Sequence, residues 1–216
     1  MEILVVPHAW STKVSCIIYV DGMMLINKYK IEVGFDTSAT NPILHDIAFE
    51  KVEMFFDILM NNSIITTKES FEEKKLNLEN NYIELYDILN DQTLGCIIFS
   101  KLMSIVGEDL VINYIKISSE LGKGIRYHID NDSPELNILL PNKEEWWTNC
   151  DIKNQPWWMR PDSATYDEIL TKDDIYNGEF DWEDHFREDI KKANSLDNKK
   201  SKFEIIRGGK DETNSN

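Results

Sequence analysis

The chain contains little cysteine. Its 216 residues include Cys16, Cys96 and Cys150, and no two of these have the Cys-x-x-Cys spacing. A disulfide framework needs several paired cysteines, and a thiolate zinc site needs closely spaced ones. The sequence therefore argues against both and favours a protein that stays reduced inside a cell.

Common catalytic and phosphate-binding motifs are also missing. Gly122 and Gly124 lack both the third glycine of a dinucleotide loop and the Gly-Lys-Ser/Thr ending of a P-loop. There is no Gly-x-Ser-x-Gly, and Cys96 lies in an apolar segment, where a thiol is usually inert. Residues 173–189 are acidic but lack the ligand order of a calcium loop. We expect no cofactor, no metal and no catalytic residues.

Long hydrophobic runs are absent as well. The first ten residues, MEILVVPHAW, carry an acid at position 2, and no basic segment precedes their short apolar run, unlike a signal peptide. No stretch approaches the roughly 20 apolar residues that a membrane helix needs. We expect a cytoplasmic protein that does not bind membranes.

Basic residues are few in relation to acidic ones. The chain has 39 Asp and Glu against 23 Lys and Arg, a net charge of −16. Such a charge repels nucleic-acid phosphates and anionic membrane surfaces. It therefore predicts no direct nucleic-acid binding, and it suits a protein partner with a basic surface.

Among the features that are present, a β-hairpin is the clearest. Apolar residues alternate with polar ones before Asp21-Gly22, a dipeptide typical of a two-residue type I′ turn. One face would be apolar except at Asn27, and the other would carry Lys13 and Lys28. The turn predicts four cross-strand pairs: Val20 with Met23, Ile18 with Leu25, Cys16 with Asn27, and Val14 with Tyr29.

Two helices and further strands are predicted beyond the hairpin. Asn41-Pro42 is a cap and first-turn pair, and the apolar spacing then predicts a helix that ends before Asn61-Asn62. A second, buried helix is predicted at 93–106. Short strands are expected at 2–6 (ended by Pro7), 63–66, 111–117, 126–130 and 136–140.

These elements together predict an α+β fold. We expect an N-terminal antiparallel β-meander with packed helices, an irregular Trp-rich segment and an acidic C-terminal extension. The corresponding boundaries are a core domain at 1–141, a Trp-rich and acidic segment at 142–190 packed on or extending from it, and a disordered tail at 191–216.

The most unusual local feature is two tryptophan pairs close to dense acids. Trp146-Trp147 and Trp157-Trp158 precede residues 162–189, which hold 11 acids against Lys172 and Arg187. One interpretation is a loop whose indoles pack on the sheet. The other is a partner-binding surface, because exposed aromatic and arginine side chains anchor many interfaces. Its candidate residues are Trp146, Trp147, Trp157, Trp158 and Arg160.

Two sets of residues suggest metal-dependent alternatives. His128-x-Asp130 with a later His185 has the ligand order of a two-His-one-carboxylate iron site. Carboxylates such as Asp21, Asp87 and Asp130 would suit a two-metal nuclease if they converged. The Asp-Gly turn already explains Asp21, and the acidic setting of His185 argues for a solvated residue.

Part of the chain resembles a family of large tailed bacteriophages. Residues 86–119 (YDILNDQTLGCIIFSKLMSIVGEDLVINYIKISS), the overlapping SSELGKGIRYH and the later Trp-Trp resemble an uncharacterised family of T4-like phages. The resemblance covers about a third of the chain. It implies a virus-encoded protein in the bacterial host cytoplasm and no site residues.

The resulting functional prediction is a non-enzymatic acidic protein-interaction factor. It would be a phage accessory protein that binds a basic surface of a host or viral protein, in the extreme by imitating DNA. A metal-dependent hydrolase or nuclease is the first alternative, and a virion structural component is the second. The sequence does not predict an oligomeric state.

Overall fold

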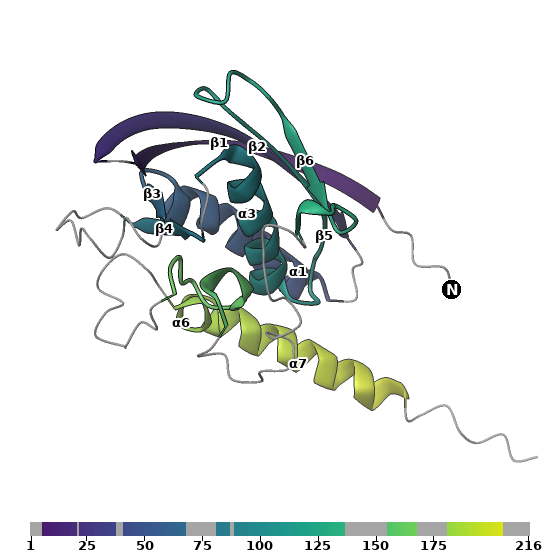
Figure 1. The fold of residues 1–216 in the computed structure, drawn as a ribbon. Coiled ribbons are helices and arrows are strands. Elements are labelled where there is room, and N and C mark those ends of the chain that lie inside the picture. Colours follow the sequence, from purple (N-terminus) through teal and green to yellow (C-terminus); the bar gives the residue numbers. More distant parts are fainter. Residues whose placement is uncertain are drawn as a thin grey trace, which may run out of the picture.

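The fold combines one mixed β-sheet with a layer of helices on one of its faces (Figure 1). This computed structural model describes residues 6–20, 22–37, 41–67, 81–86, 89–136, 155–167 and 181–204. The strands are β1 (Val6–Val20), β2 (Met23–Thr37), β3 (Ile64–Thr67), β4 (Tyr82–Leu85), β5 (Val111–Ser119) and β6 (Tyr127–Asp130). The helices are α1 (Pro42–Met54), η1 (Phe55–Met60), α3 (Asp91–Val106), η3 (Trp157–Met159), α6 (Trp182–His185) and α7 (Arg187–Glu204).

The sheet has the order β4-β3-β1-β2-β5-β6. Strands β1, β2, β5 and β6 are antiparallel neighbours, whereas β3 runs parallel to both β1 and β4. The α+β class and the N-terminal antiparallel hairpin are therefore confirmed. No helix of the described residues has the length and apolar character needed to cross a membrane.

The hairpin register agrees with the prediction at all four pairs, Val20–Met23, Ile18–Leu25, Cys16–Asn27 and Val14–Tyr29. The lysines of both strands are exposed on the opposite face. The strand break predicted at Pro7 is wrong, because β1 continues through Pro7, which pairs with Asp36. Proline is tolerated there because β3 pairs with β1 only at Ile17 and Ile18, so the ring faces an unpaired edge. Residues 2–5 lie outside the described part.

The first helix begins and ends where its capping residues predict. The side chain of Asn41 accepts a hydrogen bond from the Ile43 amide, and Pro42 is the first helical residue. The helix continues into the wider turns of η1, which end at Asn61. Most of its apolar residues face the core, and Ile58 is exposed; the buried ones are Ile47, Ala48, Val52, Phe55, Phe56, Leu59 and Met60.

The second helix, α3, packs on strands β5 and β6 of the sheet and lies beside α1 and η3. Asn90 caps it by accepting a hydrogen bond from the Thr93 amide. Gly95 lets it approach the sheet closely, because a Cβ at that position would lie 2.3 Å from Ile129 Cδ1 and 2.8 Å from Ile117 Cγ2. The strands predicted at 63–66, 111–117 and 126–130 are present as β3, β5 and β6.

The strand predicted at 136–140 is wrong at its first residue. Leu136, which the apolar run 136–140 predicted to begin a strand, belongs to a short helical turn. Its amide donates a hydrogen bond to the carbonyl oxygen of Ser133. Residues 137–140 of that predicted strand are not among the described ones.

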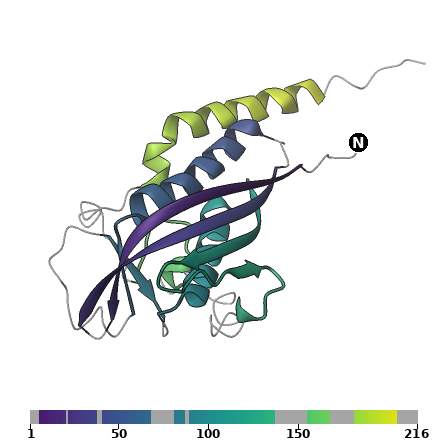
Figure 2. The ribbon, with the colours of Figure 1, turned by 90° about the horizontal axis from the view of Figure 1, so that it is seen from above.

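The tail predicted to be disordered from residue 191 is helical as far as Glu204. Helix α7 packs alongside α1 (Figure 2), and its Ala193 is fully buried. Lys191 and Lys192 pair with acids three residues earlier, which stabilises the first turns. The prediction of disorder followed from the many polar residues of this segment. It did not take into account that Phe186 and Ala193, seven residues apart, lie on one buried face of a helix.

Candidate functional site

The segment 155–167 is an extension of the core and not an exposed loop. It lies along β4, where the Glu84 amide donates to Thr165 O at 3.0 Å and the Thr165 hydroxyl donates to Tyr82 O. The indole Nε1 of Trp157 donates to Glu84 O at 2.9 Å. This segment therefore covers the outer edge of the sheet and fills the space next to α3.

Three of the predicted partner-binding residues lie in this segment and are buried. Trp157, Trp158 and Arg160 have exposed fractions of 0%, 2% and 1%. The two indoles meet edge to face, and the Arg160 guanidinium pairs with Asp162 at 3.1 Å. These three side chains are packed inside the protein, as in the first of the two interpretations of the sequence, and do not form an exposed anchor surface. Trp146 and Trp147 lie outside the described residues.

The iron-site candidates are held by local contacts. His128 Nε2 lies 3.3 Å from Asp130 Oδ2, and the His128 ring stacks on Tyr114. Asp130 accepts bonds from the Ser133 hydroxyl and the Asp132 amide, and the Ser133 bond is the main reason that its pKa is lowered. His185 belongs to α6. In the described part of the chain, no three His, Cys, Asp or Glu residues are grouped as metal ligands would be.

The nuclease and thiol candidates add no site. Asp21 and Asp87 lie outside the described residues, and Asp130 closes a turn. Burial raises the pKa of both Cys16 and Cys96 to about 12, so these thiols are protonated at neutral pH and poor nucleophiles.

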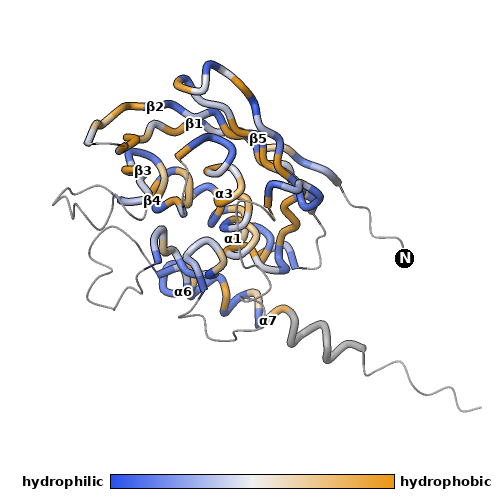
Figure 3. The backbone as a smooth tube through the Cα atoms, viewed as in Figure 1, coloured by the Kyte–Doolittle hydropathy of each residue, from blue (hydrophilic) through white to orange (hydrophobic). Residues whose placement is uncertain are grey.

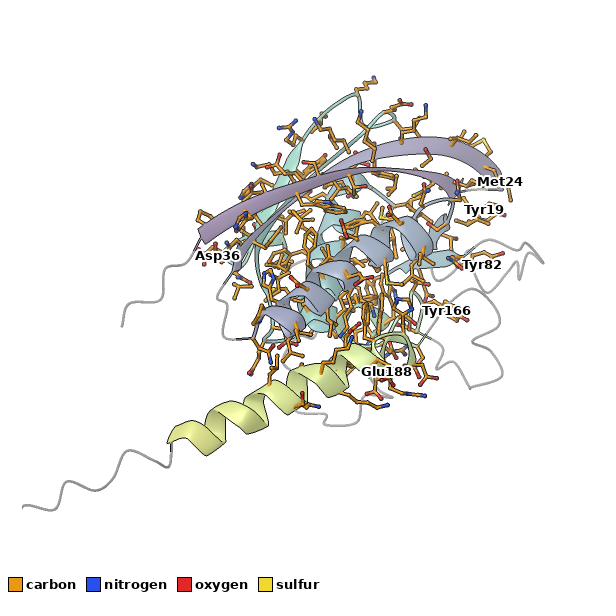
Figure 4. All side chains as sticks on the ribbon, turned by 180° about the vertical axis from the view of Figure 1, so that it is seen from behind. Tyr19, Met24, Asp36, Tyr82, Tyr166 and Glu188 are labelled. Atoms are coloured by element: carbon orange, nitrogen blue, oxygen red, sulfur yellow. The ribbon has the colours of Figure 1, made fainter. Side chains whose placement is uncertain are left out.

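Charges of both signs are exposed on both sides of the described molecule. Exposed acids such as Asp46 and Glu50 lie on α1, and Glu188 lies on α7, where Figure 4 labels it. Lys191 and Lys192 are exposed on the same helix, and Lys13, Lys28 and Lys30 are exposed on the opposite face of the sheet.

A run of four exposed apolar residues lies at the tip of the β1–β2 hairpin. Met23, Met24, Leu25 and Ile26 are 56%, 48%, 41% and 73% exposed. We call these four residues the hairpin-tip surface. Figure 3 shows hydrophobic residues along this end of β2, and Figure 4 labels Met24 beside Tyr19 at the same end. Covering a fully exposed side chain of this size contributes about 1.5–3 kcal/mol.

The hairpin-tip surface lies on a stretch of β2 that β5 does not reach. Strand β5 pairs with β2 only from Tyr29 onward, so among the described strands residues 23–26 have β1 as their one neighbour. Successive side chains of a strand point to opposite faces. Both faces of residues 23–26 are therefore apolar. This is unusual, because edge strands commonly carry charged side chains that prevent unwanted pairing. The run Met-Met-Leu-Ile directly after Asp-Gly is the sequence signal for this surface, since four consecutive apolar residues place apolar side chains on both faces of a strand. A prediction based on alternation considers one face only and does not reveal it.

No family model matches the chain, and no curated protein is similar to it. Among solved structures, an uncharacterised protein from Wolinella succinogenes has a TM-score of 0.45 at 8% identity, covering 60% of this chain and 99% of that one. Two catalytic-residue variants of 6-pyruvoyltetrahydropterin synthase from Plasmodium vivax have TM-scores of 0.39 and 0.36 at 9% and 8% identity. Each aligns over 58% of this chain and 97% of its own. Scores below 0.5 carry no argument about function.

Proposed function

We propose that the protein is a non-enzymatic interaction factor that binds another protein through the hairpin-tip surface. The observation that carries the proposal is the combination of four exposed apolar side chains with a strand edge at residues 23–26 that has no neighbour among the described strands. Contiguous exposed apolar surface is typical of interaction sites, and an open strand edge is a template for pairing.

Strand addition is the binding mode that uses both properties. An extended segment of the partner would pair with the backbone of β2, while its alternate side chains contact Met23 and Leu25 on one face and Met24 and Ile26 on the other. The main-chain hydrogen bonds would supply affinity, and the side-chain contacts would supply specificity.

The surroundings of the edge define the chemistry of the partner segment. The turn after β5 begins beside it, since the Glu120 amide donates to Lys28 O at 3.0 Å. Lys123 is exposed in this turn, and Lys28, also exposed, lies 4.0 Å from Glu120, the one acid of the turn. With two lysines against one acid, the edge suits an apolar segment flanked by acidic residues. Binding of a basic surface, which follows from the net charge alone, remains a separate prediction.

The proposal is tested with two matched charge substitutions. Ile26→Lys places a charge in the hairpin-tip surface, whereas Ile58→Lys does so at an exposed isoleucine of η1, away from the edge. A protein captured by the wild-type chain would be identified and purified. Its dissociation constant would then be measured for the wild type, Ile26→Lys and Ile58→Lys.

We expect the purified partner to bind wild type and Ile58→Lys equally and to bind Ile26→Lys at least tenfold more weakly, about 1.4 kcal/mol. Equal binding by Ile26→Lys would contradict the proposal. So would association of the chain with itself that Ile26→Lys abolishes, because the edge would then be occupied by a second copy.

A further inference from the structure

A pocket of about 310 Å³ lies next to the hairpin-tip surface, where Asn27 and Tyr29 continue β2. Its wall comes from the ends of β1 and β2, from the start of α3 and from the turn after β5. The apolar part of this wall includes Ile18, Val20, Leu89, Leu94, Leu121 and Ile125. The volume can hold a large side chain, because pockets for small molecules commonly begin at about 300 Å³.

The rim of the pocket is apolar and exposed. Leu121 and Ile125 line the pocket, and both are exposed to solvent. Leu121 lies beside β2, because its amide donates to Asn27 Oδ1 at 3.0 Å. Together with the hairpin-tip surface, these two side chains make six of the ten large apolar side chains that are exposed among the described residues. Exposed apolar area is therefore concentrated around the pocket, as is typical of an interaction site.

Three polar side chains of the wall are bonded within the chain. The side chain of Asn27 bonds a backbone amide of the turn and also the side chain of Tyr29. Asp91 Oδ2 accepts a hydrogen bond from the Ser119 hydroxyl at 2.7 Å, and Asn90 caps α3. A polar ligand would have to replace these bonds, whereas an apolar one would leave them intact. The pocket therefore suits an apolar occupant.

The pocket lies on the side of the sheet to which a partner strand would point alternate side chains. Met23 and Leu25 pair with Val20 and Ile18, and both of these partners line the pocket. Residues directly opposite one another in a sheet share a face. In a strand added to the edge of β2 that β5 does not reach, the residue opposite Leu25 therefore points its side chain to the pocket side.

We propose that the pocket is the anchor site of the docking surface and takes one aromatic side chain of the partner's added strand, from the residue opposite Leu25. The inference rests on the proposed function and specifies its partner, an extended segment with one aromatic residue and with acids that face Lys28 and Lys123. An aromatic ring fills a pocket of this size and leaves its polar groups bonded. Tryptophan and tyrosine are also the commonest anchors of protein interfaces.

A first test needs no partner. The probe is 3-methylindole, which is the tryptophan side chain as a free molecule. It would be titrated into the wild-type chain while the methyl signals of isoleucine and leucine are followed by NMR. Those of Ile18, Leu94 and Ile125 should shift, because these side chains line the pocket. The signal of Ile58, exposed on η1, should not change.

A second test uses the purified partner. Val20→Phe fills the pocket with a ring from its own wall, whereas Val111→Phe makes the same change at an exposed valine opposite Asp36, at the far end of β2. Thermal unfolding establishes that each variant is folded. We expect Val111→Phe to bind the partner like the wild type, and Val20→Phe to bind it about tenfold or more weakly, as the loss of an interface anchor predicts. Val20→Phe should also abolish the shifts caused by 3-methylindole.

Failure of the anchor site is distinguishable from failure of the docking surface. The anchor site is overturned if 3-methylindole shifts none of the three pocket methyl signals. It is also overturned if folded Val20→Phe binds the partner like the wild type while Ile26→Lys binds it weakly, and strand addition then stands without an anchor. Equal binding by Ile26→Lys contradicts the docking surface, and the anchor site with it, whatever Val20→Phe does.

Discussion

The ammonium group of Lys101 lies 3.0 Å from the carbonyl oxygen of Trp157, a residue 56 positions later in the chain. It also donates to the carbonyls of Arg160 and Asp162, at 3.0 and 2.6 Å, and its side chain is fully buried. One lysine of α3 therefore fixes the path of the segment that carries both buried indoles. Buried charges are tolerated when they are fully hydrogen-bonded, and this one bonds three carbonyls.

Lys101→Met should destabilise the fold by about 3 kcal/mol, because three buried carbonyls lose their donor. Urea unfolding followed by tryptophan fluorescence measures this change. Lys191→Met is the control, since Lys191 forms an exposed pair with Glu188 and such pairs contribute little. A Lys101→Met protein as stable as Lys191→Met would show that Lys101 does not hold the segment in place.

Gly95→Ala should destabilise the protein by about 1–3 kcal/mol, because its methyl group would overlap Ile129 and Ile117 on the sheet. Helix propensity alone predicts the opposite sign, since alanine is the better helix former. Ser100→Ala, on a partly exposed position of the same helix, should change stability little. Chemical denaturation of the three proteins distinguishes close helix–sheet packing from propensity.

The two described thiols should be unreactive in the folded protein. Burial raises the pKa of Cys16 and Cys96 to about 12, so almost no thiolate is present at pH 8. In a Cys150→Ser background, Ellman's reagent should therefore label neither thiol in buffer and both in denaturant. Rapid labelling of the native protein would contradict the packing of Cys16 against the helical layer or of Cys96 within α3.

A surface pair on the sheet should make stability depend on pH. Glu32 accepts hydrogen bonds from Lys116 Nζ at 2.7 Å and from the Tyr114 hydroxyl at 3.0 Å, and the first of these is the main cause of its lowered pKa. Because the folded pKa lies below the usual 4.5, the stabilisation is present above that pH and is lost as the pH falls through the folded pKa.

Glu32→Gln should accordingly lower the Tm at pH 7, and the difference from wild type should shrink as the pH falls below 4.5. In a Lys116→Met background the same substitution should have a much smaller effect at pH 7. A difference in Tm that does not vary with pH would mean that Glu32 acts through packing and not through its charge.

Local signals predicted much of the fold. Asp21-Gly22 and the alternation before it determine the hairpin register, because a two-residue turn allows one pairing. Asn41-Pro42 likewise marks the start of α1, since the cap satisfies an amide within the same turn. Such features depend on neighbours in the sequence, so the sequence alone is sufficient for them.

The features that the sequence did not predict depend on distant contacts. Whether Trp157 is covered depends on Lys101 and Glu84, which lie far away in the chain. Whether Ile26 is exposed depends on where β5 stops pairing with β2, and no local pattern encodes that limit. The pocket at Asn27 requires the helix, the hairpin and a turn to meet, which only the folded chain shows.

Amide hydrogen exchange at Met24, Leu25 and Ile26, with and without the purified partner, tests the docking proposal most directly. These amides lie on the stretch of β2 before Tyr29, whose second edge has no described neighbour. The proposal predicts that the outward-facing amides of this run become protected in the complex, whereas those of η1 do not change. Unchanged exchange at the hairpin tip, together with protection elsewhere, would contradict it.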